Sequence, residues 1–249
     1  MIAILNETER AALRAAGRVA RATLDRVRAE LPRLRTTADI AELVARDTRE
    51  RGGKPSQLGY QGFPSVVCTS KNQVVCHGIP SEKELLEPGD IVNVDVTTEF
   101  GGFHGDTSAT LFIGTPSPEA RHVVRVAEQA RDVGIAALRV GGRLGEVGAA
   151  IQDFVEREGC SVVRDLGGHG IGRRMHMPPH VAHHREHREP RGVRLKEGMA
   201  LTVEPMVNWG RPEVVFLDDG WTVVTADGAL SAQFEHTVLL GANGPEIMT

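Results

Sequence analysis

The chain has 249 residues, 41% of them hydrophobic, so it can bury one large core or two modest ones. Its formal net charge of −4 argues against a nucleic-acid groove as the main surface. The apolar runs are far shorter than a membrane span, and the first residues do not form a secretory signal. Cys68, Cys76 and Cys160 cannot all pair, so no disulfide framework is expected. These features predict a soluble, cytoplasmic, globular protein.

The first half of the sequence predicts two helices followed by strands. Leu and Val recur at helical spacing over residues 8–31, and Thr8 can serve as the N-cap of that helix. A second helix is expected from its N-cap Thr37 to Arg51, before the helix-ending pair Gly52-Gly53. Apolar β runs follow at 64–70 and 73–79, predicted to meet as a hairpin at residues 71–72, and a longer hairpin is predicted at 91–113.

The second half repeats this order of elements. Ser117 followed by Pro118 is typical of a cap and a first helical turn, and it predicts a helix that reaches about Leu138. A shorter helix is expected over 144–158, ending at Gly159. The later β runs lie at 200–207, 213–217, 221–225 and 233–240. Because helices and antiparallel strands are segregated along the chain, the pattern indicates the α+β class.

An offset of 107 residues aligns the two halves with each other. The aligned pairs are Leu31 with Leu138, Ile40 with Val147, Val44 with Ile151, and Gly52 with Gly159. We therefore expect two copies of a helix–helix–sheet unit within a single domain spanning 1–249, with halves at roughly 8–115 and 116–240. Chance alignment of amphipathic helices is the alternative explanation.

Two carboxylates lie in neighbouring strands of the 91–113 hairpin. Asp95 interrupts the apolar run IVNVDV, and Asp106 opens the next one, TSATLFI. If the hairpin turns at Phe100-Gly101, paired positions sum to 201 and the two carboxylates face each other directly. Ionised carboxylates about 4.5–5.5 Å apart in a half-buried sheet need a shared proton or a cation. The alternative is a solvated edge hairpin in which both residues cap the turn.

The second half supplies further candidate metal ligands. Glu204 in LTVEPM and Glu235 in AQFEHT are carboxylates within strand patterns, and His169 lies in GGHGIG, where glycines leave room for an imidazole. Each has an ordinary explanation alone: a strand Glu usually pairs with Arg, and a loop His is usually solvated. Together with Asp95 and Asp106 they form an oxygen-rich set with one nitrogen, which suits Mn²⁺, Fe²⁺, Co²⁺ or Zn²⁺. Four carboxylates would balance two divalent ions.

The motifs VVCHGIP, NVDVTTEFGGFHGDTS, GGHGIG, TVEPM and LSAQFEHT resemble those of type I methionine aminopeptidases. These enzymes are pita-bread metallopeptidases, a family shared with aminopeptidase P and creatinase. The resemblance covers residues 8–240 and implies two pseudo-symmetric helix–helix–antiparallel-sheet halves around a central dinuclear metal site. The implied ligands are Asp95, Asp106, His169, Glu204 and Glu235. Among them, Asp106 and Glu235 would bridge both ions.

The same resemblance implies roles for residues that contact the substrate. His77 would lie near the scissile amide, His176 would steady the carbonyl oxygen of the intermediate, and Glu204 would also shuttle a proton. The pocket for the methionine side chain would be lined by Tyr60, Phe63, Cys68, Met175 and Trp221. Aromatic edges and soft groups of this kind hold a flexible thioether well.

Two segments depart from the family pattern. Many relatives carry an acidic residue after the second histidine, whereas here the run from His176 is HMPP, which leaves the orientation of that histidine open. The segment HVAHHREHREPRG carries His180, His183, His184 and His187. An accessory metal site is one explanation for them, and a charged surface loop is the favoured one.

The implied function is removal of the initiator methionine from nascent polypeptides. A metal-activated hydroxide would hydrolyse the first peptide bond, with preference for a small second residue. The cofactors would be two divalent ions (Co, Mn, Fe, Zn or Ni), and the enzyme would act as a monomer on the N-terminal methionine, with no membrane and no specific nucleic acid as partner. The basic first helix is better explained as a solvated face than as a ribosome contact.

Two other functions are compatible with part of these observations. An X-Pro aminopeptidase or prolidase of the same fold would use the same five ligands. The methionine-pocket residues argue against this function. So does the expectation that the chain begins directly with the first helix of the catalytic unit, which leaves no room for the additional N-terminal domain of those enzymes. A non-catalytic pita-bread module that binds protein or RNA would have no need to keep the ligands and both histidines.

Overall fold

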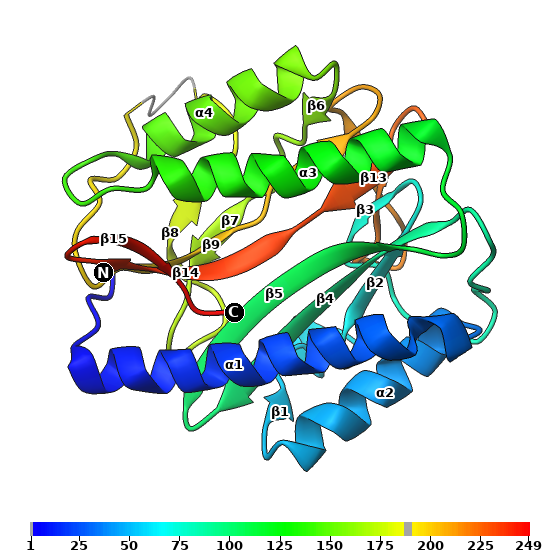
Figure 1. Ribbon diagram of the computed structural model, residues 1–249, viewed down its shortest axis with the longest axis horizontal. Coiled ribbons are helices and arrows are strands. Elements are labelled where there is room, and N and C mark those ends of the chain that lie inside the picture. Colours follow the sequence, from blue (N-terminus) through cyan, green and yellow to red (C-terminus); the bar gives the residue numbers. More distant parts are fainter. Residues whose placement is uncertain (1, 187–190) are drawn as a thin grey trace.

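The computed structural model describes residues 2–186 and 191–249. In Figure 1 one helix pair lies below the central strands and the other above them. The helices of the first pair are α1 (Glu7–Glu30) and α2 (Thr37–Glu50), and those of the second are α3 (Pro118–Ala137) and α4 (Leu144–Arg157). Short 3₁₀ turns cover Leu31–Arg33 and Tyr60–Gly62.

The strands of the described chain form one large antiparallel sheet and two small ones. The large sheet has the order β1 (Lys54–Pro55), β4 (Ile91–Phe100), β5 (Phe103–Phe112), β14 (Glu235–Gly241), β9 (Ala200–Val203), β7 (Gly168–Gly170) and β8 (Met177–Val181), with β2 (Cys68–Lys71) on β4 and β15 (Gly244–Ile247) on β14. The small sheets are β13 (Ser231–Gln233) with β10 (Met206–Asn208) and β6 (Ser161–Val162), and β11 (Val214–Phe216) with β12 (Val223–Thr225) and β3 (Val74–Cys76).

The helix starts follow from side-chain capping. Asn6, in extended conformation, accepts a hydrogen bond from the Glu9 amide, and the Glu9 carboxylate accepts one from the Asn6 amide. Thr36 and Asp39 form the same reciprocal capping box before α2. The predicted N-caps Thr8 and Thr37 are therefore wrong, because an acidic residue three positions on completes the box at the earlier site. Ser117 caps α3 as predicted.

The β4–β5 hairpin turns one residue later than predicted. Its register pairs Ile91 with Phe112 and Asp95 with Ser108, and the turn consists of Gly101 and Gly102 at φ of 61° and 79°. A two-residue hairpin turn of this kind needs left-handed backbone at both positions, which glycine adopts without steric cost. The predicted direct pair of Asp95 and Asp106 is thus wrong. Because the register shifts by two, the carboxylates keep one face and become diagonal neighbours.

Two predicted strands are each divided by a passage between sheets. The run 200–207 becomes β9 in the large sheet and β10 in a small one, with Glu204 and Pro205 between them. The run 233–240 divides in the same way between β13 and β14 at Phe234. Pro205 has no N–H to donate to a ladder, so a break at that point is expected. Glu204 and Glu235 therefore lie where the chain changes sheet.

The predicted hairpin of residues 64–79 does not form. β2 pairs with β4 of the large sheet, whereas β3 pairs with β12 of a small sheet. Asn72 directs this divergence: it lies at φ 54°, its side chain donates to Asp90, and it accepts from the Ile91 amide. Cys68 and Cys76 consequently stand on different sheets, and both are free thiols.

The helix pairs match one another at the aligned positions. The apolar members of the four pairs are all buried, and Gly52 and Gly159 follow α2 and α4 with φ of 78° and 77°. One continuous apolar core joins both helix pairs to the sheet. This correspondence supports two copies of a helix pair packed on a shared sheet. None of the described helices is long and apolar enough to cross a membrane.

Candidate active site

A cavity of about 350 Å³ opens between the two halves of the large sheet. Every residue assigned to the site from sequence lines it: the five candidate ligands, His77, His176, and the pocket residues Tyr60, Phe63, Cys68, Met175 and Trp221. The side chains come from β2, β4, β5, β7 and β14, from the β9–β10 passage, and from segments outside the strands. The carboxylates and His169 lie at one end of this set, and aromatic and sulfur-containing groups form the rest.

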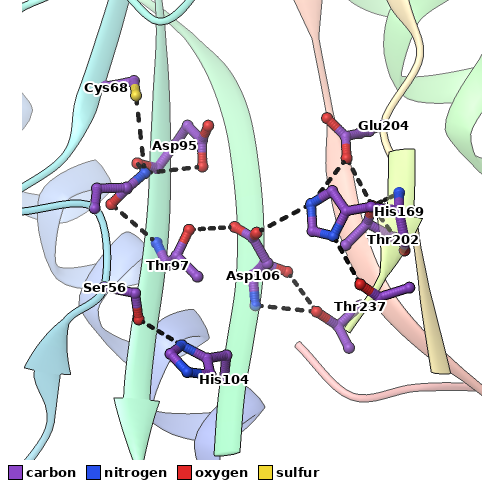
Figure 2. A network of polar contacts seen from close by, with 12 residues as sticks. Ser56, Cys68, Asp95, Thr97, His104, Asp106, His169, Thr202, Glu204 and Thr237 are labelled. Atoms are coloured by element: carbon purple, nitrogen blue, oxygen red, sulfur yellow. Dashed lines mark hydrogen bonds and ion pairs between the residues drawn. The ribbon is translucent and has the colours of Figure 1, made fainter. Parts of the chain in front are cut away.

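Neighbouring hydroxyl and amide groups orient three of the four carboxylates (Figure 2). Asp106, on β5, accepts a hydrogen bond of 2.7 Å from the Thr97 hydroxyl. Glu204 accepts from the Thr202 hydroxyl at 2.6 Å and from the Gln233 amide at 3.1 Å. The third carboxylate is that of Asp95. The Gln57 side-chain amide donates to the Asp95 main-chain carbonyl at 2.8 Å and to the Asp95 carboxylate at 3.4 Å.

His169 directs one ring nitrogen into this group of acids. Its Nδ1 lies 3.0 Å from the Gly170 carbonyl, which can only accept, so Nδ1 carries the proton and the Nε2 lone pair is free. Nε2 lies 3.7 Å from an Asp106 carboxylate oxygen and 3.6 Å from a Glu204 oxygen. Asp106, His169 and Glu235 can each offer a ligand atom within 4.8 Å of the others. A single ion could therefore contact all three.

The protonation of these residues indicates that positive charge is needed here. Burial raises the pKa of Asp106 to about 7 and that of Glu204 to about 8. Burial and the neighbouring carboxylates raise the pKa values of Asp95 and Glu235 well above their ordinary range. Burial lowers the pKa of His169 to about 3, so it stays a neutral ligand. Close, buried acids of this kind must hold protons unless a cation replaces them.

The donor set fits divalent metal ions. Glu235 is 2% exposed, and within the described chain its Oε1 has no hydrogen-bond partner, so a buried acceptor is left over. Four carboxylates and one imidazole form a hard to borderline set with no thiolate. Burial also raises the pKa of the Cys68 thiol well above its usual value, so Cys68 is a neutral wall group rather than a ligand or nucleophile.

His77 and His176 occupy the rim between the two ends of the cavity. The ring of His176 stands 4.1 Å from that of His169 and 5.0 Å from that of Tyr60, and burial lowers its pKa to about 4. These ring contacts orient His176 despite the HMPP departure. His77 adopts a left-handed backbone at φ 55°, and burial lowers its pKa as well. Both imidazoles are therefore neutral near pH 7.

The apolar end is built from ordinary packing. Phe63 meets Trp221 edge to face with ring centroids 5.1 Å apart, and His77 stands 6.3 Å from Trp221 in a similar geometry. Phe63, Cys68 and Met175 are buried. Such edge-to-face contacts stabilise a wall without any bound ligand.

Three lining residues were not predicted from the sequence: Gln57, Gln61 and Thr97. Thr97 lies two positions after Asp95 on the same face of β4 and pairs with Asp106, so the correct hairpin register would have identified it. Gln57 is buried in PSQLGY, outside any apolar alternation, and Gln61 lies at φ 49° in a 3₁₀ turn. Neither of these two carries a sequence signal.

The histidine-rich segment differs from the predicted charged surface loop. His183 is fully buried, and its Nε2 accepts a hydrogen bond of 3.2 Å from the Glu204 amide. The segment packs closely on α4, where a Cβ on Gly148 would collide with the Ala182 and His184 carbonyls. His180 pairs with His169 across β7 and β8. No accessory metal cluster occurs among these histidines in the described residues, and His187 lies outside them.

Comparison with known proteins places the chain in a family. Residues 11–242 match the sequence pattern of metallopeptidase family M24. The chain belongs to this family. It is 46% identical to methionine aminopeptidase A of Synechocystis over 248 residues, which cover 100% of this chain and 97% of that protein. The crystal structure of methionine aminopeptidase from Rickettsia prowazekii is 43% identical, covers 100% of both chains and superposes with a TM-score of 0.95.

The family comparison also bears on the rival function. The crystal structure of X-Pro aminopeptidase from Thermotoga maritima is 19% identical, with a TM-score of 0.76 over 99% of this chain and 62% of that one. This likeness shows a common fold and no more. The predicted pita-bread fold and the metal-dependent aminopeptidase class are confirmed by the match to the family and to methionine aminopeptidases.

Proposed function

We propose that this enzyme removes the N-terminal methionine from nascent polypeptides whose second residue is small. The observation that carries the proposal is one cavity in which a soft, apolar end adjoins a group of carboxylates. Cys68 on β2 pairs with Asp95 on β4, so the two ends meet across a single strand pair. A methionine side chain held at the apolar end would place its amine and first carbonyl beside the acids.

We further propose that Asp95, Asp106, His169, Glu204 and Glu235 hold two divalent ions, with Asp106 and Glu235 shared between them. Both acids belong to the group whose ligand atoms lie within 4.8 Å of one another, and the Oε1 of Glu235 has no partner in the described chain, which supports these two as the shared ligands. Bound ions would supply Lewis-acid and water-activating chemistry for peptide hydrolysis. Co, Mn, Fe, Zn and Ni all suit the donor set.

The protein's own side chains would position the peptide and move protons. His77 would contact the scissile amide nitrogen, and His176 would donate from a ring nitrogen to the carbonyl oxygen as negative charge develops there. Glu204, fixed by Thr202 and Gln233, would accept a proton on its carboxylate and return it to the leaving amine. These three roles can be filled together because His77, His176 and Glu204 all line the same cavity.

We infer a cytoplasmic monomer that acts on free N-termini. The basic residues of α1 are largely paired within the molecule: Arg10 with Glu197, Arg14 with Glu246 and Arg21 with Asp25. This pairing supports a solvated helix face rather than a ribosome contact.

Hydrolysis of Met-Ala-Ser and of Ala-Pro-type peptides would test the proposal. Metal-stripped protein would be reloaded with Mn²⁺, Co²⁺ or Fe²⁺ before the assay. We expect Met-Ala-Ser to be cleaved and the Ala-Pro peptides to be left intact. Preferential cleavage of Ala-Pro would support the X-Pro aminopeptidase instead, and hydrolysis of neither by the loaded protein would support a non-catalytic module.

A further inference from the structure

The β11–β12 hairpin presents three consecutive exposed apolar residues. Val215, Phe216 and Leu217 are 47%, 57% and 42% exposed. Single exposed apolar residues are common, but a contiguous run of large ones on a soluble protein indicates a contact surface. Val214, by contrast, packs on the buried cluster under the hairpin. The hairpin is thus anchored at Val214, and the next three residues form an exposed apolar strip, with Val215 and Leu217 on one face of the strand and Phe216 on the other.

The same strand has an open hydrogen-bonding edge. β11 pairs with β12 alone and ends the order of its small sheet within the described chain. The Leu217 amide donates to the Thr222 carbonyl, and the Ala226 amide donates to the Glu213 carbonyl. The backbone N–H and C=O groups of the odd-numbered residues of β11 therefore point toward β12. Because antiparallel strands alternate, the N–H and C=O groups of Val214 and Phe216 point outward. They offer the pattern to which another strand can add.

This edge is continuous with the wall of the active-site cavity. The turn after β11, residues 217–222, carries Trp221, which lines the cavity and contacts Phe63 edge to face. Leu217 and Thr222 are joined by a backbone hydrogen bond of 2.9 Å. The exposed strip is therefore connected to the cavity wall through this turn, in which Trp221 directly precedes Thr222.

Charge around the strip selects among partners. The exposed residues Glu213, Asp218 and Asp219 flank it, and the nearby Arg211 lies 3.9 Å from Asp227. An acidic border repels RNA phosphates and anionic lipid. It suits an extended peptide with apolar side chains and basic ones between them.

We propose that β11 binds the part of the substrate polypeptide that follows the cleaved bond, as an added β-strand. The inference rests on the proposed function, because the N-terminus of that polypeptide would occupy the cavity, and Trp221 connects the lining of that cavity to the β11–β12 hairpin. Main-chain bonds to Val214 and Phe216 tolerate many sequences, which suits an enzyme that meets many N-termini. Apolar side chains of the substrate would pack on Val215, Phe216 and Leu217.

Peptides that differ in length and polarity test this inference on the metal-loaded enzyme. The substrates are Met-Ala-Ser, the apolar Met-Ala-Ser-Val-Lys-Val-Lys and the polar Met-Ala-Ser-Ser-Lys-Ser-Lys. We expect kcat/KM for the apolar heptapeptide to exceed that for the tripeptide about tenfold, mainly through KM, as partial burial of two apolar side chains allows. N-methylation of the backbone within the added residues should reduce the advantage.

Two variants complete the test. Phe216→Ser should bring the ratio of heptapeptide to tripeptide kcat/KM close to one. Ile247→Ser, at a similarly exposed apolar residue on β15, should leave the ratio at its wild-type value. A ratio that is equal in wild type and Phe216→Ser, with Met-Ala-Ser still hydrolysed, would overturn the inference and leave the proposed function standing. If no Met peptide were hydrolysed, both would fail.

A second measurement separates other occupants of the strip. Sedimentation of the wild type and Phe216→Ser would show a dimer that the substitution dissolves if the strip joined two copies of this chain. That result would overturn the inference. A monomer in both proteins, together with the lost heptapeptide advantage, would support it.

Discussion

The two ends of the active-site cavity are stabilised in different ways. At the apolar end, Phe63 and Trp221 meet edge to face and Met175 is buried, so contacts within the protein complete that wall. At the acidic end, four carboxylates line the cavity beside a neutral His169, Asp106 and Glu235 among them are buried, and Glu235 keeps an oxygen without a partner in the described chain. The apolar end is preformed, whereas the acidic end is complete only with a cation.

This difference separates recognition from chemistry. A preformed apolar pocket binds a side chain at little reorganisation cost. Buried acids without a cation hold protons instead, and divalent ions must displace those protons. Substitutions at the acidic end should therefore change metal binding, activity and pH dependence together, while those at the apolar end should change substrate affinity.

The largest effect is expected from Asp106→Asn. Asp106 lies between His169 and the hydroxyl of Thr97, and it is a proposed shared ligand. We expect kcat to fall by more than about 10⁴-fold, because losing one ligand weakens the whole metal group on which hydrolysis depends. Stripping the wild type with chelator should have the same effect, reversed by added Mn²⁺ or Co²⁺.

The matched control for that substitution is Asp165→Asn, at an exposed acid outside the cavity. It should keep wild-type activity and metal content. Full activity of the Asp106→Asn protein, or of wild type shown by metal analysis to contain no metal, would remove the basis for calling the acidic end a metal site.

A smaller effect is expected for the two rim histidines. His77→Ala and His176→Ala should each lower kcat by about 10²–10⁴-fold, the range for a lost proton-transfer or oxyanion partner. Metal content should stay near that of the wild type, because neither histidine belongs to the ligand set proposed here. His122→Ala, on α3 and outside the cavity lining, is the control and should be fully active. Loss of metal in His176→Ala would reassign that residue as a ligand.

Much of this site could be predicted because its charged residues interrupt sequence patterns that are otherwise typical of apolar strands. Asp95 and Asp106 stand out in apolar strands, and Glu204 and Glu235 do so likewise. The register could be corrected from the same letters, since only Gly101-Gly102 satisfies a two-residue turn with left-handed backbone at both positions. An even shift kept both acids on one face, so the site prediction survived the wrong register.

The remaining features depend on tertiary contacts that leave no local pattern. Nothing near His183 in the sequence shows that it is buried and bonded to the Glu204 amide, because Glu204 and the helix α4, which packs on the backbone on either side of His183, come from distant segments. The division of residues 200–207 into two sheets follows partly from Pro205, but the identity of each sheet depends on partners elsewhere. The Gln57 side-chain amide donates to the Asp95 carboxylate, but nothing in the sequence distinguishes this glutamine from any other glutamine in a loop.

Gln57→Leu tests whether the acidic end depends on its supporting shell. The glutamine donates to the Asp95 carboxylate and accepts from the Thr97 amide, so it orients one proposed ligand. We expect the dissociation constant for Mn²⁺ to rise about 10–100-fold, the usual effect of losing a partner that orients a ligand. Calorimetric titration of the stripped protein measures this. Gln61→Leu is the control, since it lines the cavity and its amide bonds to Tyr60 instead.

An unchanged dissociation constant in Gln57→Leu would contradict the prediction. Asp95 would then be oriented by the strand itself, and the comparison between a preformed and a metal-dependent end would rest on the carboxylates alone.

The smallest and most direct effect concerns the metal-free protein and pH. Burial raises the pKa of Asp106 to about 7 and that of Glu204 to about 8, above the ordinary values of 3.8 and 4.5 for the unfolded chain. The folded metal-free protein therefore binds more protons than the unfolded chain between about pH 4 and pH 8. By linkage, these two acids make the free energy of unfolding fall as pH rises through that window. Metal binding should reverse the trend, because ions replace the protons.

Asp106→Asn isolates one of these acids without removing its hydrogen bond, since an asparagine oxygen can still accept from the Thr97 hydroxyl. At pH 5 Asp106 is protonated and neutral, so metal-free mutant and wild type should melt at similar temperatures. At pH 9 the wild type must ionise Asp106 in a buried site beside Glu204, whereas the mutant stays neutral there. The mutant should then melt a few degrees higher, as roughly 1 kcal/mol corresponds to about 2–4 °C for a chain of this size. Thermal unfolding of both proteins in chelator at the two pH values measures the difference. A metal-free mutant that melts several degrees below wild type at both pH values would show that Asp106 stabilises the fold as a hydrogen-bonding carboxylate, and the acidic end would then be as self-sufficient as the apolar one.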